Sequence, residues 1–394
     1  MVLVFVGGGA LAASIGNPPP SVSRPLSIAI DASRTTIRRR TGTEQYAYHL
    51  LQALLRLETE HRFTLYFRDD PGDLFPPFPH VRHCVIPFRR AWTHLRFAAA
   101  LRKDRPDVTF VPAHTLPFVF PGRAVFTAHD LGYLYFPQAH PRRERLYLDL
   151  TTRYSANRAA RVIAVSGATR DDLVRHYETP SDKIDVIHLG VEGVSRAPDD
   201  EIAAVRLKYT LPERYFLFLG TIQPRKNVPR LTQAYSLWLQ ASGNSEIGLV
   251  VAGKAGWILD VQRDVIAPLP ESIQKRVILP GYVPAEDAPA LISGALALVF
   301  PSLYEGFGLP VIEAMRCGTP VITAITSSLP ELAGTAALYV DPLSVEEIAG
   351  AMAHMAGSAD VRQGLIARGM VQAAEFTWKT AAIQTMKTLE GAAQ

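Results

Sequence analysis

Two glutamates flank a glycine-rich loop in the second half of the chain. Residues 304–313 read Tyr-Glu-Gly-Phe-Gly-Leu-Pro-Val-Ile-Glu, so seven residues separate Glu305 from Glu313. The preceding apolar run, residues 295–300, is typical of a buried parallel strand, and Pro310 suits the first turn of a helix. Free backbone N–H groups make such a helix start an anion site. Two carboxylates beside it indicate a ligand that also carries hydroxyl groups, such as a sugar. The alternative is a plain strand–turn–helix whose acidic residue favours the helix dipole.

Two adjacent cations follow another apolar run. Arg225 and Lys226 come after residues 215–219, ahead of a helix that we expect to begin near Val228. Arginine supplies a planar fork of donors and lysine a compact charge, and together they suit a diphosphate. The alternative is a solvated basic loop.

A histidine and an aspartate follow a third apolar run. His129 and Asp130 follow residues 124–127. Open α/β sheets bind ligands beyond the carboxyl ends of their strands, which places this pair at a predicted binding edge. The alternative is a histidine that is hydrogen-bonded inside its own loop. His114 is a weaker candidate of the same kind.

These candidates depend on strands that alternate with helices along the whole chain. The first half predicts strands at residues 26–31, 63–67, 82–87, 108–111, 124–127, 161–165 and 183–188. The second half predicts strands at residues 215–219, 247–252, 277–279, 295–300, 320–323 and 337–341. Two successive sets of this kind predict two doubly wound, Rossmann-like α/β domains whose strand ends face a central cleft.

Composition shifts suggest where these domains begin and end. A stretch with glycine, proline and aspartates, residues 192–200, reads as the linker. We therefore expect a first domain over residues 26–195 and a second over residues 196–375, with a C-terminal helix over residues 376–394 that can cross back to the first. Residues 1–25 imitate a dinucleotide-binding glycine loop but leave no room for a crossover helix, so we interpret them as a flexible extension.

Overall composition is typical of a globular protein, with 394 residues of which 48% are hydrophobic and 20% charged. Cys84 and Cys317, the only cysteines, indicate no disulfide framework. The sequence has neither a Cys/His cluster with zinc-ligand spacing nor an Asp-x-Asp motif. We therefore expect no metal and no other cofactor.

Charge is unevenly distributed between the two halves. Residues 1–195 carry 25 Lys and Arg against 18 Asp and Glu, whereas the remainder carries 16 against 19. A basic first half fits an anionic partner, such as a membrane surface or a phosphorylated acceptor. No recognised motif supports nucleic acid.

A basic helix is predicted near the middle of the first domain. Residues 89–103 combine Trp92, Leu95 and Leu101 with several arginines. Such a helix can lie on an anionic membrane. Alternatively, it covers a sheet and presents a solvated basic face.

Five segments, in this order, resemble glycosyltransferase family 4, a group of retaining enzymes with the two-domain GT-B fold. They are Thr41-Gly42; His129-Asp130; Gly220 with Arg225, Lys226 and Asn227; residues 281–283; and residues 305–313. The two glutamates match the E-x7-E signature of that family. The resemblance covers about residues 26–390.

The resemblance implies roles for individual residues. Glu305 would face the donor sugar, Glu313 would hold the nucleotide ribose, Arg225 and Lys226 would bind the diphosphate, and His129 would lie near the reacting centre. Further donor-binding positions are Gly42, Gly220, Tyr282, Val283, Gly306, Phe307, Gly308 and Leu309. The chain departs from the family pattern after Gly42, where Thr43-Glu44-Gln45 replaces a glycine-rich run. Because a carboxylate beside a diphosphate is unfavourable, we expect Glu44 to point away from it, towards the acceptor.

The resemblance therefore predicts a retaining, metal-independent glycosyltransferase that moves a hexose from a GDP- or UDP-sugar to a glycan or lipid-linked acceptor in cell-surface polysaccharide synthesis. Similarity of residues 26–31, 41–42 and 127–136 to bacterial polysaccharide mannosyltransferases indicates mannose. We expect a cytoplasmic protein with peripheral contact at the inner face of the membrane. The alternatives are a sugar-nucleotide epimerase on the same fold and a non-catalytic nucleotide-sugar-binding protein.

Overall fold

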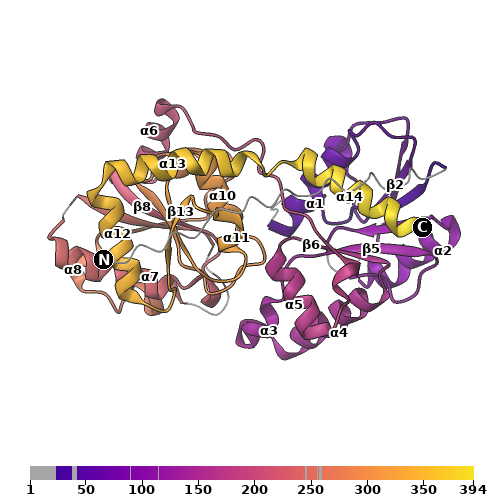
Figure 1. The fold of residues 1–394 in the computed structure, drawn as a ribbon, viewed down its shortest axis with the longest axis horizontal. Coiled ribbons are helices and arrows are strands. Elements are labelled where there is room, and N and C mark those ends of the chain that lie inside the picture. The colour runs from indigo at the N-terminus through magenta and orange to yellow at the C-terminus, as the bar shows by residue number, and fades with distance from the viewer. Residues whose placement is uncertain are drawn as a thin grey trace, which may run out of the picture.

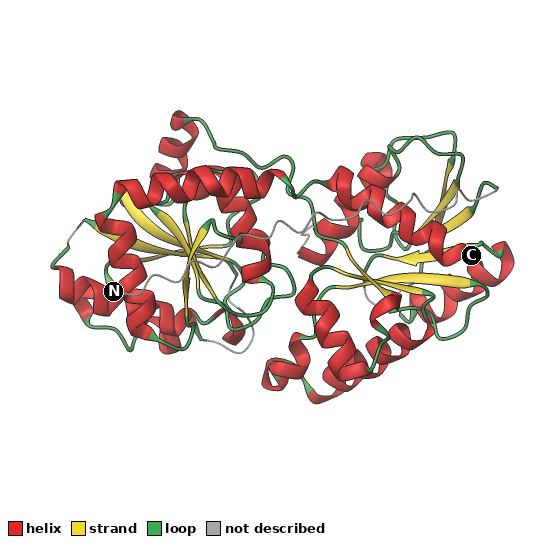
Figure 2. Cartoon of the chain, in the orientation of Figure 1, coloured by secondary structure: helices red, strands yellow, loops and turns green. Residues whose placement is uncertain are grey.

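The computed structural model describes residues 24–37, 42–88, 90–113, 115–244, 246–254, 256 and 260–394. The chain forms two parallel sheets with helices on both sides of each (Figures 1 and 2). Every predicted strand is present, and the predicted pair of doubly wound domains is confirmed. The expectations for residues 1–23, Thr41, Arg89 and His114 lie outside the described residues.

The first sheet has the strand order β3-β2-β1-β4-β5-β6-β7. Its strands are β1 (Ser27–Asp31), β2 (Arg62–Phe67), β3 (Val81–Val85), β4 (Val108–Val111), β5 (Arg123–Ala128), β6 (Arg161–Ala164) and β7 (Ile184–Val186). Its helices are α1 (Gly42–Leu54), α2 (Ala98–Asp104), α3 (Gly132–Tyr135), α4 (Arg142–Arg158) and α5 (Gly167–Tyr177), and a π-helical turn, η2 (Thr93–Phe97), leads into α2.

The second sheet has the order β10-β9-β8-β11-β12-β13. Its strands are β8 (Arg214–Leu219), β9 (Ile247–Ala252), β10 (Val277–Gly281), β11 (Ala297–Phe300), β12 (Val321–Ala324) and β13 (Ala337–Val340). Its helices include α6 (Asp199–Lys208), α7 (Val228–Ser242), α8 (Glu271–Gln274), α9 (Ala288–Ser293), α10 (Leu309–Arg316), α11 (Leu329–Ala333), α12 (Val345–Gly357) and α13 (Ala359–Ala374). Strands β9, β11 and β12 are buried along their whole length, because helices cover both faces of a parallel sheet.

The last helix, α14 (Trp378–Ala393), returns to the first domain, where it packs against α1 and the neighbouring strands (Figure 1). The side chain of Thr377 caps this helix by accepting from the Thr380 amide. The backbone N–H of Trp378 donates to Oε1 of Glu192 at 2.7 Å, and the Trp378 indole stacks on His49 with ring centroids 5.5 Å apart. The segment that leaves the first domain and the segment that returns to it are thus hydrogen-bonded to each other.

The basic segment at residues 89–103 allowed two arrangements, a helix that lies on a membrane and a helix that covers a sheet. Phe97 and Leu101 are fully buried and Trp92 is nearly so, which is the arrangement expected of a helix that covers a sheet. Leu95, however, remains 57% exposed. No helix among the described residues is long and apolar enough to cross a bilayer.

Two glycines let the carboxyl ends of β8 and β9 meet. Gly253 has φ +143°, and a Cβ there would stand 1.8 Å from the carbonyl oxygen of Gly220. We expect Gly253→Ala to lower the free energy of unfolding by about 1–3 kcal/mol, because the added methyl overpacks a site without free space. Thermal or denaturant unfolding measures this. Gly350→Ala is the matched control, since nothing lies within 4 Å of its Cβ position. Equal stability of the two variants would contradict the close approach.

Candidate active site

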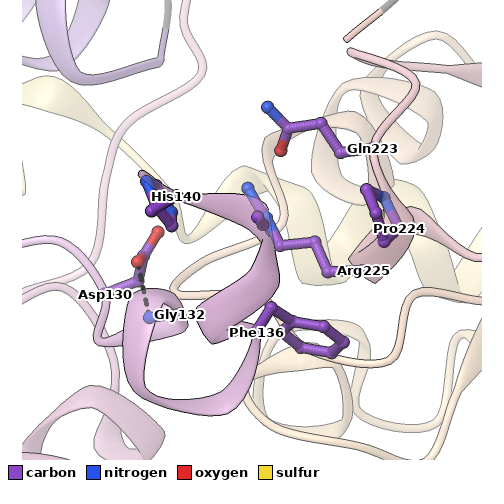
Figure 3. Close-up of a pocket in the computed structure, with 8 residues that line it drawn as sticks. Asp130, Gly132, Phe136, His140, Gln223, Pro224 and Arg225 are labelled. Carbon is purple, nitrogen blue, oxygen red and sulfur yellow. Dashed lines mark hydrogen bonds between the residues drawn. The ribbon is translucent and has the colours of Figure 1, made fainter. Parts of the chain in front are cut away.

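The two sheets present their carboxyl ends to a cavity between the domains (Figure 3). The first domain contributes Asp130, Gly132, Phe136, Ala139 and His140, and the second contributes Gln223, Pro224 and Arg225. The cavity has a volume of about 200 Å³. The imidazole of His140 and the guanidinium of Arg225 thus face the same cavity from opposite domains. Parallel α/β sheets commonly bind ligands at this edge.

The structure brings three of the predicted residues together beside this cavity. Nη1 of Arg225 donates to Oε2 of Glu305 at 2.7 Å, and Nζ of Lys226 donates to Oε1 of Glu305 at 2.5 Å. Glu305 is only 5% exposed and Lys226 only 7%. A buried carboxylate with two cations forms a compact charged cluster, which we call the Glu305 cluster.

The backbone around the two cations is fixed by the residue that follows them. Arg225 and Lys226 lie in a 3₁₀ turn, η5 (Pro224–Lys226), and Asn227 adopts a left-handed conformation with φ +62°. The Asn227 amide donates to the carbonyls of Pro301 and Pro342 at 3.0 and 2.6 Å. A short polar side chain tolerates this backbone conformation and locks the turn against the β11 loop.

The Glu305 cluster sets the charge states of its members. Burial alone would raise the pKa of Glu305, but the charges of Arg225 and Lys226 outweigh burial and lower that pKa to about 2. Burial lowers the pKa of Lys226 to about 8, and the Arg225 charge adds to this effect while Glu305 opposes it. The cluster therefore keeps its carboxylate ionised, while burial makes its lysine easier to deprotonate than an exposed one.

Glu313 lies in α10 and is half-buried. Its carboxylate forms no hydrogen bond or ion pair with any other side chain of the described residues, and burial raises its pKa to about 7. An unpartnered carboxylate of this kind can accept hydrogen bonds from ligand hydroxyl groups.

His129 makes the contact expected of a histidine bonded within its domain. Its Nε2 lies 2.9 Å from the carbonyl oxygen of Pro112, and the Tyr46 ring packs edge-on against the imidazole at 4.8 Å. Burial lowers the pKa of His129, which favours the neutral ring. Its predicted place near the donor sugar stays a prediction.

The predicted donor-loop residues occupy the start of α10. Gly308 precedes the helix with φ +122°, Leu309 is its first residue and Phe307 is buried. The N–H groups of these residues stand at a helix start, as an anion site requires.

Three further predicted residues lie on other elements than the Glu305 cluster. Gly42 begins α1, while Tyr282 and Val283 follow β10, two strands away from β8. The Tyr282 ring is half-exposed and packs under Nζ of Lys254 at 5.1 Å. Glu44 is 8% exposed and lies 3.8 Å from Arg34, so a cation of the first domain accompanies this carboxylate.

Sequence reasoning missed a set of contacts that join the domains beside Glu305. Oη of Tyr304 donates to Asp172 of α5 at 2.7 Å and accepts from the Leu131 amide at 3.1 Å. The Tyr304 ring also stacks on Tyr135 at 4.8 Å. A tyrosine adjacent to Glu305 was visible in the sequence, but its partner on the other domain was not.

Two further interdomain contacts surround this tyrosine. Ser166, the N-cap of α5, accepts from the Thr169 amide and also donates to the Gly306 carbonyl at 2.7 Å. Glu331 accepts from the Gly167 amide at 2.9 Å and lies 2.6 Å from Nε2 of His188. The loop of the second domain that carries Tyr304 and Gly306 is therefore docked on the first domain. Among the described residues, no group of three or more His, Cys, Asp or Glu side chains is arranged to hold a metal ion.

Comparisons with known proteins agree with this architecture. The family described as Glycosyltransferase Family 4 matches residues 40–192, and the family described as Glycosyl transferases group 1 matches residues 201–369. The chain is 35% identical over 303 residues to the O-antigen chain mannosyltransferase B of Escherichia coli, covering 76% of each protein.

Two solved structures share the fold. A sucrose-phosphate synthase from Thermosynechococcus elongatus superposes with a TM-score of 0.69 at 22% identity, covering 92% of this chain and 98% of that one. Anabaena Alr3699/HepE in complex with UDP-glucose superposes with a TM-score of 0.69 at 17% identity, covering 93% of this chain and 100% of that one.

Gly306 lies where the two domains approach each other most closely in this loop. A Cβ at Gly306 would stand 2.0 Å from the carbonyl oxygen of His129 across the domain boundary. We expect Gly306→Ala to push the two domains apart, because the added methyl group clashes with the His129 backbone and separation of the domains relieves the clash. Small-angle X-ray scattering should show a larger radius of gyration, with a melting temperature that changes by no more than a few degrees. Gly391→Ala, with no atom within 4 Å of its Cβ position, is the control. Identical scattering for the two variants would refute a tight boundary at this glycine.

Proposed function

The chain belongs to glycosyltransferase family 4, and from that membership we propose that it transfers mannose from GDP-mannose, with retention of anomeric configuration and without a metal ion, to a glycan or lipid-linked acceptor in polysaccharide synthesis. The observation that carries the proposal is the buried Glu305 cluster, with its two cations at the carboxyl end of β8. Similarity to the O-antigen mannosyltransferase supports mannose as the transferred sugar.

Leaving-group stabilisation is the main catalytic task of the site. The bond between the sugar C1 and the diphosphate oxygen breaks, and the electron pair leaves with the nucleoside diphosphate. Arg225 and Lys226 face the charge that develops on this oxygen, and the N–H groups of Phe307, Gly308 and Leu309 add a helix start beside it. These fixed positive groups supply the charge compensation for which other enzymes use a metal ion.

The acceptor hydroxyl attacks C1 on the face that the diphosphate leaves. Its oxygen forms the new glycosidic bond, and its proton passes to the departing phosphate oxygen. In this scheme Glu305 forms no covalent bond. It accepts hydrogen bonds from sugar hydroxyls once the diphosphate has drawn Arg225 and Lys226 towards itself, and it stabilises the positive charge at C1.

The remaining residues position the donor. Glu313 accepts from the ribose hydroxyls, the loop at Gly220 and the start of α1 at Gly42 approach the phosphates, and the backbone at Tyr282 and Val283 meets the base. His129 orients the sugar. Domain contacts through Tyr304 keep this constellation together and exclude water.

Acceptor binding falls to the first domain, whose sequence carries the basic excess. A lipid-linked acceptor would bring the enzyme to the inner face of the membrane as a peripheral protein. The basic balance of residues 1–195 supports this location.

A donor panel tests the function. The purified protein is incubated with GDP-mannose, UDP-glucose and UDP-N-acetylglucosamine, with a lipid-linked glycan acceptor and with EDTA present, and nucleotide release is followed. We expect turnover with GDP-mannose, an α-linked product from the α-linked donor by NMR, and no effect of EDTA. Turnover of a UDP-sugar alone would overturn the donor assignment, and a changed sugar formed without acceptor would indicate an epimerase. If no donor is turned over, nucleotide binding alone would indicate a binding protein.

Within the same assay, we expect Glu305→Gln to lower kcat by roughly a hundredfold or more, because a neutral amide stabilises the positive charge at C1 poorly. Glutamine preserves the shape of the side chain and still accepts hydrogen bonds. The matched control is Glu271→Gln, at a side chain that is 82% exposed in the same domain. Full activity of the Glu305→Gln enzyme would remove Glu305 from the mechanism.

The affinity for GDP-mannose should depend on pH in two ways. Glu313, whose pKa is raised to about 7, must lose its proton to accept well from ribose hydroxyls, so affinity falls as the pH drops through about 7. Lys226, whose pKa is lowered to about 8, must keep its proton to hold the diphosphate, so affinity falls as the pH rises through about 8. Isothermal titration calorimetry across this range measures both limbs. Glu313→Gln should abolish the acid limb and retain the alkaline limb; an unchanged acid limb would exclude Glu313 as its source.

A further inference from the structure

Helix α4 exposes leucines on the side opposite its buried face. Its buried residues are Thr151, Ser155 and Ala156. Leu146 and Leu150 lie on the opposite side of the helix and are 58% and 56% exposed. Solvent-facing positions of a surface helix are ordinarily polar, so a leucine pair one turn apart at these positions needs an explanation.

Side chains from two neighbouring segments continue this apolar surface. Tyr147, 50% exposed, lies with its hydroxyl 3.1 Å from Nε2 of His94 in η2. The His94 ring in turn stacks on Phe118 at 4.1 Å, and Phe118 is 49% exposed. Leu95, next to His94, is 57% exposed. Three segments that are distant in sequence thus form one connected surface.

We call this the α4 surface and define it by the exposed side chains Leu95, Phe118, Val119, Leu146, Tyr147 and Leu150. It belongs to the first domain, and none of its members lines the cavity between the domains. In Figure 1, α4 runs along the outer side of that domain, beyond α5.

Arginines frame the leucines on the same side of α4. Arg142, Arg143 and Arg153 are all exposed, and no ion pair joins any of them to a carboxylate of the described residues. The Arg153 guanidinium lies over the Tyr177 ring at 5.1 Å. Arg96, beside Leu95, is exposed as well and lies over the Phe88 ring at 5.6 Å. Exposed apolar groups with exposed arginines beside them are complementary to a surface that offers hydrocarbon beneath negative charge.

We propose that the α4 surface docks the enzyme on an anionic lipid bilayer, with Leu146 and Leu150 inserted between the lipids and the arginines against the headgroups. This deepens the proposed function, because a lipid-linked acceptor would then be presented to the first domain. The surface differs from the basic helix that the sequence indicated, since Phe97 and Leu101 of that helix are buried and only Leu95 is shared.

The residue types of the α4 surface favour a lipid partner over a glycan or a second copy of this chain. A glycan is held by carboxylates and amides that accept from its hydroxyls, whereas the six members of the surface offer leucine, valine and phenylalanine with a single hydroxyl group. A second copy of this chain would bring the same arginines face to face, and like charges that oppose each other are unfavourable.

Vesicle co-sedimentation tests the proposal. The full chain is mixed with vesicles of phosphatidylcholine alone or of equal parts phosphatidylcholine and phosphatidylglycerol, at low and high salt. We expect binding to the anionic vesicles that weakens with salt, and little binding to phosphatidylcholine alone. Leu146→Ser with Leu150→Ser should weaken the anionic binding by roughly tenfold or more, because burial of two leucine side chains is lost.

The matched control replaces two exposed leucines elsewhere, Leu207→Ser with Leu343→Ser, which are 84% and 63% exposed in the second domain. This variant should bind vesicles like the unaltered chain. Failure of the unaltered chain to bind anionic vesicles, or equal binding by the Leu146/Leu150 variant, would overturn the proposal. A dimer that the Leu146/Leu150 variant dissociates would assign the surface to a second copy instead.

Turnover of GDP-mannose with a short water-soluble acceptor is measured for the same proteins. It should be unchanged in the Leu146/Leu150 variant, since these residues lie outside the cavity. A raised KM for that soluble glycan, with unchanged vesicle binding, would identify an acceptor surface and overturn the membrane assignment. Vesicle binding without any turnover would leave docking intact and contradict the proposed function alone.

Discussion

The site depends on the pairing of one buried carboxylate with two cations. A charge removed from water is tolerated only when partners replace its hydration, so Glu305 and Lys226 could not both be buried without each other and Arg225. Because β8 and β11 are neighbours in the sheet, the loops that follow them meet and bring these residues within bonding distance. The Asn227 side chain then fixes the turn that carries the two cations. The proposed function uses this cluster to bind a diphosphate.

The same loop also connects the domains. Tyr304 and Gly306 stand on either side of Glu305, and both contact the first domain. The Tyr304 hydroxyl donates to the Asp172 carboxylate, and the Gly306 backbone lies close to the His129 carbonyl. Any movement of the domains therefore displaces the residues next to the charged cluster. A site built this way is complete only when the domains are together, which links substrate enclosure to the geometry of the reacting groups.

The first domain has two separate surfaces. One faces the cavity through Asp130 and His140, and the other is the α4 surface on the outside of the domain. The basic excess of the first half of the sequence is thus partly explained by arginines that accompany exposed leucines. In the proposed function, acceptor delivery and sugar transfer use different faces of the same fold.

Local patterns in the sequence determined the strands, the two-domain architecture and the pairing of residue types at the strand ends. Buried parallel strands read as continuous apolar runs, and the turns after them carry the polar residues, so Glu305 and Lys226 could be placed without a structure. The partnership of Tyr304 with Asp172 could not, because it depends on how two rigid domains are oriented, which no local pattern encodes. The direction of Leu146 was equally hidden, since helical periodicity identifies an apolar stripe but only packing decides which side of the helix faces the core.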